Sequence, residues 1–527
     1  DNLTNFQAIR RDGEDFEVIT HYDPFFTQKC QVDIDFFSDN SETITLDPGA
    51  SKTVVYLAVP INQVAYVDGG WHIGADEVQI CYTDHSGIVE NGYDMYVNPR
   101  VPPLDIIAAL QGSDYLIITN PEKIKQHNSN SFEEMDKLLS TMAELARWKN
   151  GSLGYLNVSW TTEANFDPGY DGDVQDQIKQ WGHYMQGSDG TPSGYLSSGY
   201  LLIVGETEIV PSGTKKMTGK SYLSKEDKPL IHCTDMYYAN TSGTSFNPEL
   251  MVGRIIGNSA YQLIIPIKTS IRVHTGASGY SFDRSDAFIL SGWRKGRDGS
   301  CDCTNFPSQA TNVESKLAEK GTNSEILDCT QYDTGEDMRE AFFQSVADSD
   351  IIHLAGHGNS ECCDELCAGH VCWEIEPFGS ANPFVYASSC LTGQYEGHYC
   401  LGEGFFEKGA AAYLGSTEVS YCCCNKRIAV AFYDRWDPGE SIGSVVKELK
   451  RHLGSYKWKH PSYGYYEDIW TAEYQLYGDP KYGLGVFPPT GAVATSPEPQ
   501  TPLGVTAINY SCNAMAREAG DVHELVS

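Results

Sequence analysis

Apolar and polar residues follow two different patterns along the chain, and the change falls near residue 104. Before it, apolar residues alternate with polar ones or form short runs, as in residues 30–36 and 51–59, and turn formers such as Asp47-Pro48-Gly49 separate the runs. Such alternation without helical spacing is typical of β-strands. Residues 1–104 are therefore predicted to form a β-rich N-terminal domain, a small sandwich or barrel with an accessory or pro-like role.

Beyond residue 104, apolar runs of strand length alternate with segments of helical spacing. Strands are predicted at residues 115–119, 157–162, 199–206, 286–292, 325–329, 351–355, 384–387 and 410–416, and helices at 132–149, 174–186, 311–320, 338–346, 428–436 and 442–453. This alternation builds right-handed βαβ units, so it predicts an α/β fold with an open, mostly parallel sheet and helices on both faces. We expect two α/β subdomains, 105–280 and 281–487, followed by a Pro/Ser/Thr-rich linker and tail at 488–527.

Two of the predicted strands end next to reactive side chains. The run at 351–355 stops at Gly356-His357-Gly358, and the run at 384–387 stops just before Cys390. The carboxyl ends of parallel strands share one edge of a sheet, so these side chains are expected to meet. A thiol nucleophile needs a base, usually His. The pattern predicts a catalytic pair of His357 and Cys390, with the backbone N–H groups of Gly358 and Cys390 facing a developing oxyanion.

Each residue taken alone also has a structural interpretation. His followed by Gly is common in loops, and a Cys at a strand end often serves as a small buried hydrophobe. Because both residues end predicted strands of one sheet, the pair favours the catalytic interpretation. His353 lies inside its strand and is predicted to be a packed core residue.

The same residues resemble the gingipain-like cysteine peptidases of the clan that also holds caspases, legumain and clostripain. The likeness rests on Leu354-Ala355-Gly356-His357-Gly358 and on Tyr386-Ala387-Ser388-Ser389-Cys390, and it extends over roughly residues 113–486 to the turn Gly478-Asp479-Pro480. It implies a caspase-like fold and a cysteine endopeptidase. In that chemistry the Cys390 thiolate attacks a peptide carbonyl, and His357 protonates the leaving amine and then activates water.

One departure from the family pattern concerns the acidic residues. Gingipain-like enzymes carry an acidic residue just after the strand that corresponds to residues 289–291, where this chain has Trp293, Arg294 and Lys295. The nearest carboxylates belong to Asp298 and Asp302. A third catalytic residue is therefore not assigned, and neither is the aspartate that gives arginine preference.

A second departure is a cysteine-rich insertion at residues 361–372, which holds four cysteines and His370. These side chains could ligate Zn²⁺. A disulfide-stapled loop beside the active site is the favoured alternative, because the chain has the composition of a secreted protein. Cys422-Cys423-Cys424 is the candidate disulfide partner of this loop.

Charge and cysteine content narrow the range of partners and locations. A net charge of −34 argues against nucleic acid as a partner, and no apolar run approaches the length of a membrane span. The 16 cysteines, five glycosylation sequons and a first residue other than Met favour a processed, secreted chain in the extracellular space or at the cell surface. With Cys390 free, 15 cysteines remain, so one more is free or joins two copies of the chain.

An acidic loop before the helix at 174–186 holds Asp167, Asp171, Asp173 and Asp176. Oxygen-rich loops of this kind suit Ca²⁺, although the same carboxylates could simply favour a helix N-terminus. The resemblance adds weight to calcium, because gingipain-like enzymes are calcium-dependent. The thiol chemistry itself requires no cofactor, so any calcium is expected to be structural.

Three functions therefore remain open. The first is a secreted cysteine endopeptidase of gingipain type acting on polypeptides, which the His357 and Cys390 pair motivates. The second is a catalytically inactive relative with a structural or adhesive role in an extracellular assembly, which the missing acid and the insertion motivate. The third is a transpeptidase, since an amine can capture a thioester as readily as water does.

Overall fold

The structure of the chain is a computed structural model. It describes residues 113–120, 132–156, 198–218, 229–240, 248–292, 305–332, 335–360, 377–395, 399–420, 422–455 and 467–489, with single residues between these ranges. In the N-terminal 97 residues it describes the backbone of short strands, and in a few later elements it likewise describes the backbone without every side chain.

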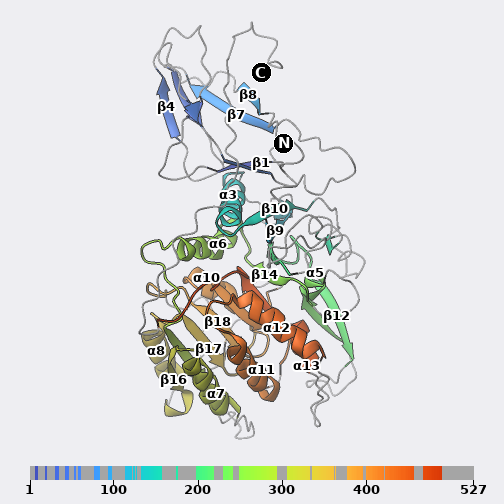
Figure 1. Cartoon of the computed structure of the whole chain (residues 1–527), viewed down its shortest axis with the longest axis vertical. Helices are drawn as coiled ribbons and strands as arrows, with labels where there is room; N and C mark the ends of the chain where they lie inside the picture. Colours follow the sequence, from blue (N-terminus) through green and yellow to red (C-terminus); the bar gives the residue numbers. More distant parts are fainter. Residues whose placement is uncertain are drawn as a thin grey trace.

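A ten-stranded sheet runs through the described part of the chain (Figure 1). Its order is β10 (Gly151–Tyr155), β9 (Tyr115–Thr119), β11 (Tyr200–Val204), β14 (Met251–Ile255), β20 (Tyr474–Gly478), β19 (Ala412–Ser416), β18 (Phe384–Ser388), β17 (Ile351–Ala355), β15 (Asp286–Ser291) and β16 (Asn323–Asp328). All neighbours are parallel except β19 and β20. The predicted mostly parallel α/β sheet is confirmed.

The antiparallel pair β19–β20 joins two parallel halves that run in opposite directions. Ser416, at the end of β19, pairs with Tyr474, at the start of β20. On its other side β20 is parallel to β14, with Arg254 paired to Tyr477. The carboxyl ends of β17, β18 and β19 therefore lie along the same edge of the sheet as the amino ends of β20 and β14.

Helices cover both faces, so the central strands β17, β18, β19 and β20 are buried along their whole length. In β17 and β18, Ile351 and Phe384 face the core with α7 (Asn305–Glu319), α11 (Cys422–Arg435) and α12 (Ile442–Ser455), while Ile352 and Val385 face α8 (Gly335–Val346) and α10 (Leu401–Glu407). The other half packs on α3 (Phe132–Trp148) and α6 (Ala260–His274), which lie side by side (Figure 1). The remaining short elements are α5 (Met236–Ala239), η2 (Cys329–Gln331), α13 (Glu467–Glu473) and the antiparallel hairpin β12 (Gly213–Thr218) and β13 (Pro229–Thr234).

The turn Gly478-Asp479-Pro480 fixes β20 to the first half of the sheet. The fully buried Asp479 carboxylate accepts hydrogen bonds from Tyr115 Oη at 2.7 Å and Ser270 Oγ at 2.6 Å, and Lys149 Nζ lies 3.5 Å away. Burial acts to raise the pKa of Asp479, but the Lys149 charge and these hydrogen bonds outweigh it and keep the pKa below its usual value. The carboxylate thus stays charged inside the protein.

Glycine is required in this turn for a steric reason. Gly478 has φ +108°, and a Cβ atom there would lie 2.6 Å from the carbonyl oxygen of Ala411. Residues with a side chain would strain the backbone and clash at once. The Gly-Asp pair therefore combines a close strand approach with a buried ionic anchor.

The N-terminal strands lie at one end of the molecule (Figure 1). They form a four-stranded antiparallel sheet and two strand pairs, consistent with the predicted β-rich region. These strands are β1 (Phe6–Ile9), β2 (Val18–Ile19), β3 (Cys30–Ile34), β4 (Glu42–Leu46), β5 (Thr53–Val54), β6 (Leu57–Pro60), β7 (Asp76–Thr83) and β8 (Tyr93–Val97).

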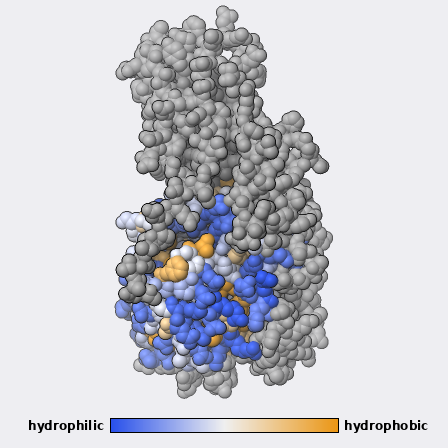
Figure 2. Space-filling view, viewed as in Figure 1, coloured by the Kyte–Doolittle hydropathy of each residue, from blue (hydrophilic) through white to orange (hydrophobic). Residues whose placement is uncertain are grey.

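The described surface on the face shown in Figure 2 is largely hydrophilic, with small apolar areas between charged ones. Among the helices of the described residues, none has the length and apolar character of a membrane span.

Candidate active site

The reactive residues follow two neighbouring strands. In the parallel pair β17 and β18, Ala355 lies opposite Ser388, and the two strands end at these residues. His357 and Cys390 each come two residues later in their chains. Both residues therefore lie at the same carboxyl edge, as expected for the pair.

A close backbone contact joins the two loops. A Cβ atom on Gly358 would lie 2.6 Å from Thr392 Cγ2, 3.0 Å from Cys390 O and 3.0 Å from Ser389 Cβ. Only glycine leaves room for this approach, which explains why the histidine is followed by one. The structure thus brings the His357-Gly358 loop against the backbone of the Cys390 loop.

Cys390 is a free, partly exposed thiol. Its Sγ donates a hydrogen bond to the carbonyl oxygen of Ser420 at 3.1 Å. Burial raises the pKa of the Cys390 thiol to about 11, and the fully buried Glu473 adds to the rise. The resting thiol is therefore protonated at neutral pH.

Ser420 is itself held in place by its neighbours. Asn425 Nδ2 of α11 donates to Ser420 Oγ at 2.7 Å, and Tyr474 Oη lies 3.4 Å from the same oxygen. Ser420 Oγ is 4.0 Å from Cys390 Sγ. Sequence reasoning missed Ser420 and Asn425, although Ser420 follows the end of β19 at the same edge and could have been found by that position.

The residue after the thiol has an unusual backbone. Leu391 has φ +58°, the left-handed region that side chains rarely occupy. Its N–H donates to Glu418 O at 3.0 Å, and this bond helps to hold the turn. Such local strain costs on the order of 1–3 kcal/mol and is concentrated at functional sites.

The imidazole of His357 is half-buried and packs edge-to-face against Phe306 at the start of α7, with ring centroids 5.1 Å apart. His353 lies in β17 and is fully buried, with Gln309 Nε2 2.9 Å from its Nε2 and Tyr433 Oη 3.3 Å from its Nδ1. Burial lowers the pKa of His353 to about 3, so its ring is neutral. The prediction that His353 belongs to the core is confirmed.

Several predicted site residues lie outside the described part of the chain. They are Trp293, Arg294, Lys295, Asp298 and Asp302 after β15, the acidic loop with Asp167, Asp171, Asp173 and Asp176, and the insertion 361–372 apart from Cys363. Within the described residues no group of three or more His, Cys, Asp or Glu side chains could hold a metal ion.

Six cysteines whose side chains the structure describes form no disulfide. They are Cys329, Cys363, Cys390, Cys400, Cys422 and Cys424. A bond between Cys422 or Cys424 and Cys363 is thereby excluded in this structure. Disulfides among the cysteines outside the described residues stay a prediction.

A free thiol and an imidazole-bearing loop in contact, each following one of two adjacent parallel strands, form the arrangement of caspase-like cysteine peptidases. The sequence profile of peptidase family C25 matches residues 108–484, most of the chain. The chain belongs to peptidase family C25. The resemblance to gingipain-like peptidases is thereby confirmed.

Several solved structures are also similar to the chain, at low sequence identity. The assignment to family C25 rests on the family profile alone. The Arg-specific cysteine proteinase gingipain R is 14% identical over 72% of this chain and 80% of its own, with a TM-score of 0.49. A structure described as a protease is 16% identical over 72% and 78%, with a TM-score of 0.48. The complex of the pro- and mature domains of RgpB from Porphyromonas gingivalis is 14% identical over 72% and 81%, with a TM-score of 0.47. No curated protein sequence matches the chain.

Proposed function

We propose that the chain is a secreted cysteine endopeptidase in which Cys390 is the nucleophile and His357 the acid–base residue. The observation that carries this proposal is the contact between Gly358 and the backbone of Cys390 at the carboxyl edge of β17 and β18. Membership of a peptidase family supports a polypeptide as the substrate.

The chemistry proceeds in two stages. In acylation, His357 accepts the proton of the Cys390 thiol, the sulfur attacks the peptide carbonyl, and the same proton passes to the leaving amine. The N–H groups of Gly358 and Cys390 stabilise the oxyanion. In deacylation, His357 takes a proton from water, the hydroxyl attacks the thioester, and the thiol is released with its proton.

The protonation state of the Cys390 thiol in the free protein determines how the first step of this mechanism begins. A thiol with a pKa near 11 that donates to Ser420 O is not a preformed thiolate. In this proposal, substrate binding brings the His357 imidazole within hydrogen-bond distance of the Cys390 thiol, as in sites whose geometry tightens on binding.

The same protonated thiol also favours a second candidate, an inactive relative with a structural or adhesive role. An extracellular or cell-surface location belongs to both candidates and rests on the cysteine content and sequons. Calcium bound by Asp167, Asp171, Asp173 and Asp176 is proposed as a structural ion in either case. Cleavage after Arg or Lys is proposed on the family likeness and the net charge of −34.

Substitution of the thiol tests the proposal. Cys390→Ala should lower peptide hydrolysis by at least about 10³-fold without changing the thermal midpoint, because only the nucleophile is removed. Hydrolysis is measured with fluorogenic peptides carrying Arg, Lys or apolar residues before the scissile bond. Cys422→Ala is the matched control, since Cys422 is the other partly exposed cysteine among the six described side chains that form no disulfide.

Three outcomes separate the candidates. Loss in Cys390→Ala with full activity in Cys422→Ala supports the peptidase. Equal hydrolysis by Cys390→Ala and the wild type excludes Cys390 as the nucleophile. A folded wild-type chain that neither cleaves peptides nor reacts with a thiol-directed peptide probe supports the structural role. An amine nucleophile added to the assay, followed by mass spectrometry of the products, detects transpeptidation.

A further inference from the structure

A pocket separate from the catalytic loops lies between α12, the start of α5 and the strands β14 and β20. Its empty volume is about 290 Å³ when the open solvent at its mouth is included. Its walls are mostly apolar and include Met236, Pro248, Leu250, Val252, Val446 and Leu476. Two lysines of α12, Lys447 and Lys450, also line it.

Lys450 is the unusual member of this lining. It is 5% exposed, and it forms no hydrogen bond or ion pair with any described residue. The other buried cations of the described chain are all bonded: Arg254 to Asp235, Arg284 to carbonyl oxygens of residues 436 and 437, Lys149 to Asp479 and Lys481 to Asp114. Lys450 thus lies at the wall of the pocket with no anion bonded to it, and its amine is available to an anionic group that enters the pocket.

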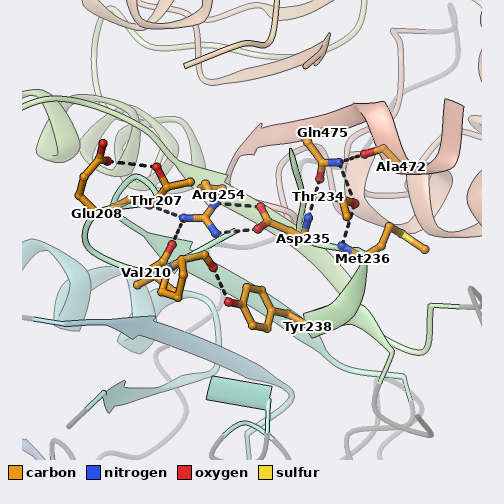
Figure 3. A network of polar contacts seen from close by, with 12 residues as sticks. Thr207, Glu208, Val210, Thr234, Asp235, Met236, Tyr238, Arg254, Ala472 and Gln475 are labelled. Atoms are coloured by element: carbon orange, nitrogen blue, oxygen red, sulfur yellow. Dashed lines mark hydrogen bonds and ion pairs between the residues drawn. The ribbon is translucent and has the colours of Figure 1, made fainter. Parts of the chain in front are cut away.

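The one carboxylate that lines the pocket is already committed elsewhere. Asp235 accepts two hydrogen bonds from Arg254, at 2.8 Å from Nε and 2.6 Å from Nη2, and its N–H donates to Gln475 Oε1 at 3.2 Å (Figure 3). In this view Asp235 lies between the two partners. Its charge therefore acts on Lys450 only through space, and it does not pair with the ammonium.

The charges around the pocket define what it could hold. Burial lowers the pKa of Lys450 to about 7, and Asp235 partly opposes this effect. Burial also lowers the pKa of Lys447, with Arg451 adding to the shift and Glu448 and Glu249 opposing it. The two lysines attract an anion, and the nearby Asp235 carboxylate repels a doubly charged group such as phosphate more strongly than it repels a singly charged carboxylate.

We propose that this pocket binds a small monocarboxylate with a short apolar chain, its carboxylate contacting Lys450 and Lys447 and its chain lying against the apolar walls. The carboxylate belongs either to a free short-chain acid or to the C-terminus of a peptide. The proposal does not depend on the function of Cys390, because neither lysine belongs to the catalytic loops.

Isothermal titration of the full chain with n-butyrate tests the proposal, and N-acetylvaline represents a peptide C-terminus. Saturable binding is expected for at least one of the two, and none for butyramide or N-acetylvalinamide, which lack the charge. Above pH 7 binding should be accompanied by proton uptake, seen as a dependence of the heat on the ionisation enthalpy of the buffer, because the anion binds the ammonium form. Whichever acid binds more tightly identifies the source of the carboxylate.

Two substitutions test whether the acid binds in this pocket. Lys450→Met should weaken binding at least tenfold, while Arg451→Met, which removes an exposed charge from the same helix, should leave it within about twofold. Lysine acetylation of the wild-type chain, read by mass spectrometry, gives a second measurement that needs no variant. The bound acid should protect Lys450 and leave Lys408 unchanged.

Either of two results would overturn the proposal. One is the absence of saturable binding of both acids by a folded wild-type chain, including the case in which only inorganic phosphate binds. The other is binding that survives in Lys450→Met or leaves Lys450 as reactive as before.

Discussion

In the half of the sheet formed by β9, β11 and β14, buried polar side chains are bonded on several sides. Arg254 donates four hydrogen bonds, two to Asp235 and one each to the carbonyl oxygens of Gly205 and Val210. At the carboxyl ends of β17 and β18, the Cys390 thiol instead bonds with Ser420 alone among the described residues, donating to its carbonyl oxygen at 3.1 Å and accepting from its Oγ at 4.0 Å, next to the strained Leu391. A buried polar group with hydrogen bonds on all of its polar atoms, which we call saturated, stabilises a fold, whereas a group with few bonds remains available to a ligand. The region around Arg254 therefore supports the fold, and the region around Cys390 is suited to the proposed site.

Replacement of Arg254, whose polar atoms are all hydrogen-bonded inside the protein, should give the largest change in the free energy of unfolding. Arg254→Met leaves the buried Asp235 carboxylate and two carbonyl oxygens without their donor. The free energy of unfolding, measured by urea denaturation, should fall by about 3–5 kcal/mol. Arg272→Met, at an exposed position, should change it by less than about 1 kcal/mol. Equal, small effects in both variants would contradict the contrast between the halves.

The rate at which the Cys390 thiol is alkylated should depend on pH. Because the pKa of Cys390 is raised to about 11, its reactive thiolate form grows as pH rises. Alkylation of Cys390 by iodoacetamide, followed by mass spectrometry, should accelerate about tenfold per pH unit from pH 7 to 10. A plateau below pH 8.5 would instead show that His357 holds a thiolate in the free protein.

Lys450 is an exception among the buried polar groups near β14, because it has no hydrogen bond or ion pair with a described residue. Its replacement tests whether an unbonded buried charge destabilises the fold. Its pKa is about 7 when folded and near 10.5 when unfolded, so folding is penalised in full below pH 7 and the penalty fades as pH rises toward 10.5. Lys450→Met should therefore raise the free energy of unfolding by roughly 1–4 kcal/mol at pH 7 and by little at pH 10. A gain that does not depend on pH would mean that packing, and not charge, is responsible.

The smallest expected effect concerns calcium. If the loop with Asp171 and Asp173 binds the ion, EGTA should lower the thermal midpoint by about 2–4 °C, close to 1 kcal/mol. Asp171→Asn should remove this response to EGTA. A midpoint that EGTA leaves unchanged would favour the interpretation of these carboxylates as a helix N-terminus.

The sequence predicts the parallel strands of this fold well and its central junction poorly. The strands that end at Ala355 and Ser388 are apolar runs between turn formers, so their pattern suffices. β20 is a short segment with the polar Gln475 as its second residue. β10 begins at Gly151, ahead of the strand predicted at 157–162, a segment outside the described residues. The β12–β13 hairpin was also missed. Strand direction and pairing depend on long-range contacts that periodicity does not record.

The site shows the same limit. His357 and Cys390 were predicted because each follows the end of a strand. Ser420 contacts the thiol, and Asn425 bonds Ser420, only through the packing of α11 and the loop after β19. Composition suggested disulfides, yet Cys329, Cys363, Cys400 and Cys424 are buried thiols that act as small apolar side chains. The local sequence therefore predicts His357 and Cys390, whereas the residues that pack around them depend on the tertiary fold.

The position of β20 has a consequence for the order in which the protein can assemble. This strand comes late in the chain but lies at the centre of the sheet, between β14 and β19. During synthesis from the N-terminus, both neighbours must wait as open edges, which are prone to pair with other chains, until Tyr474–Gly478 has left the ribosome. Tyr474 also contacts Ser420 beside the thiol, so the catalytic edge is completed only at that moment. The topology thereby delays completion of the proposed site around Cys390 until nearly the whole α/β unit has been made.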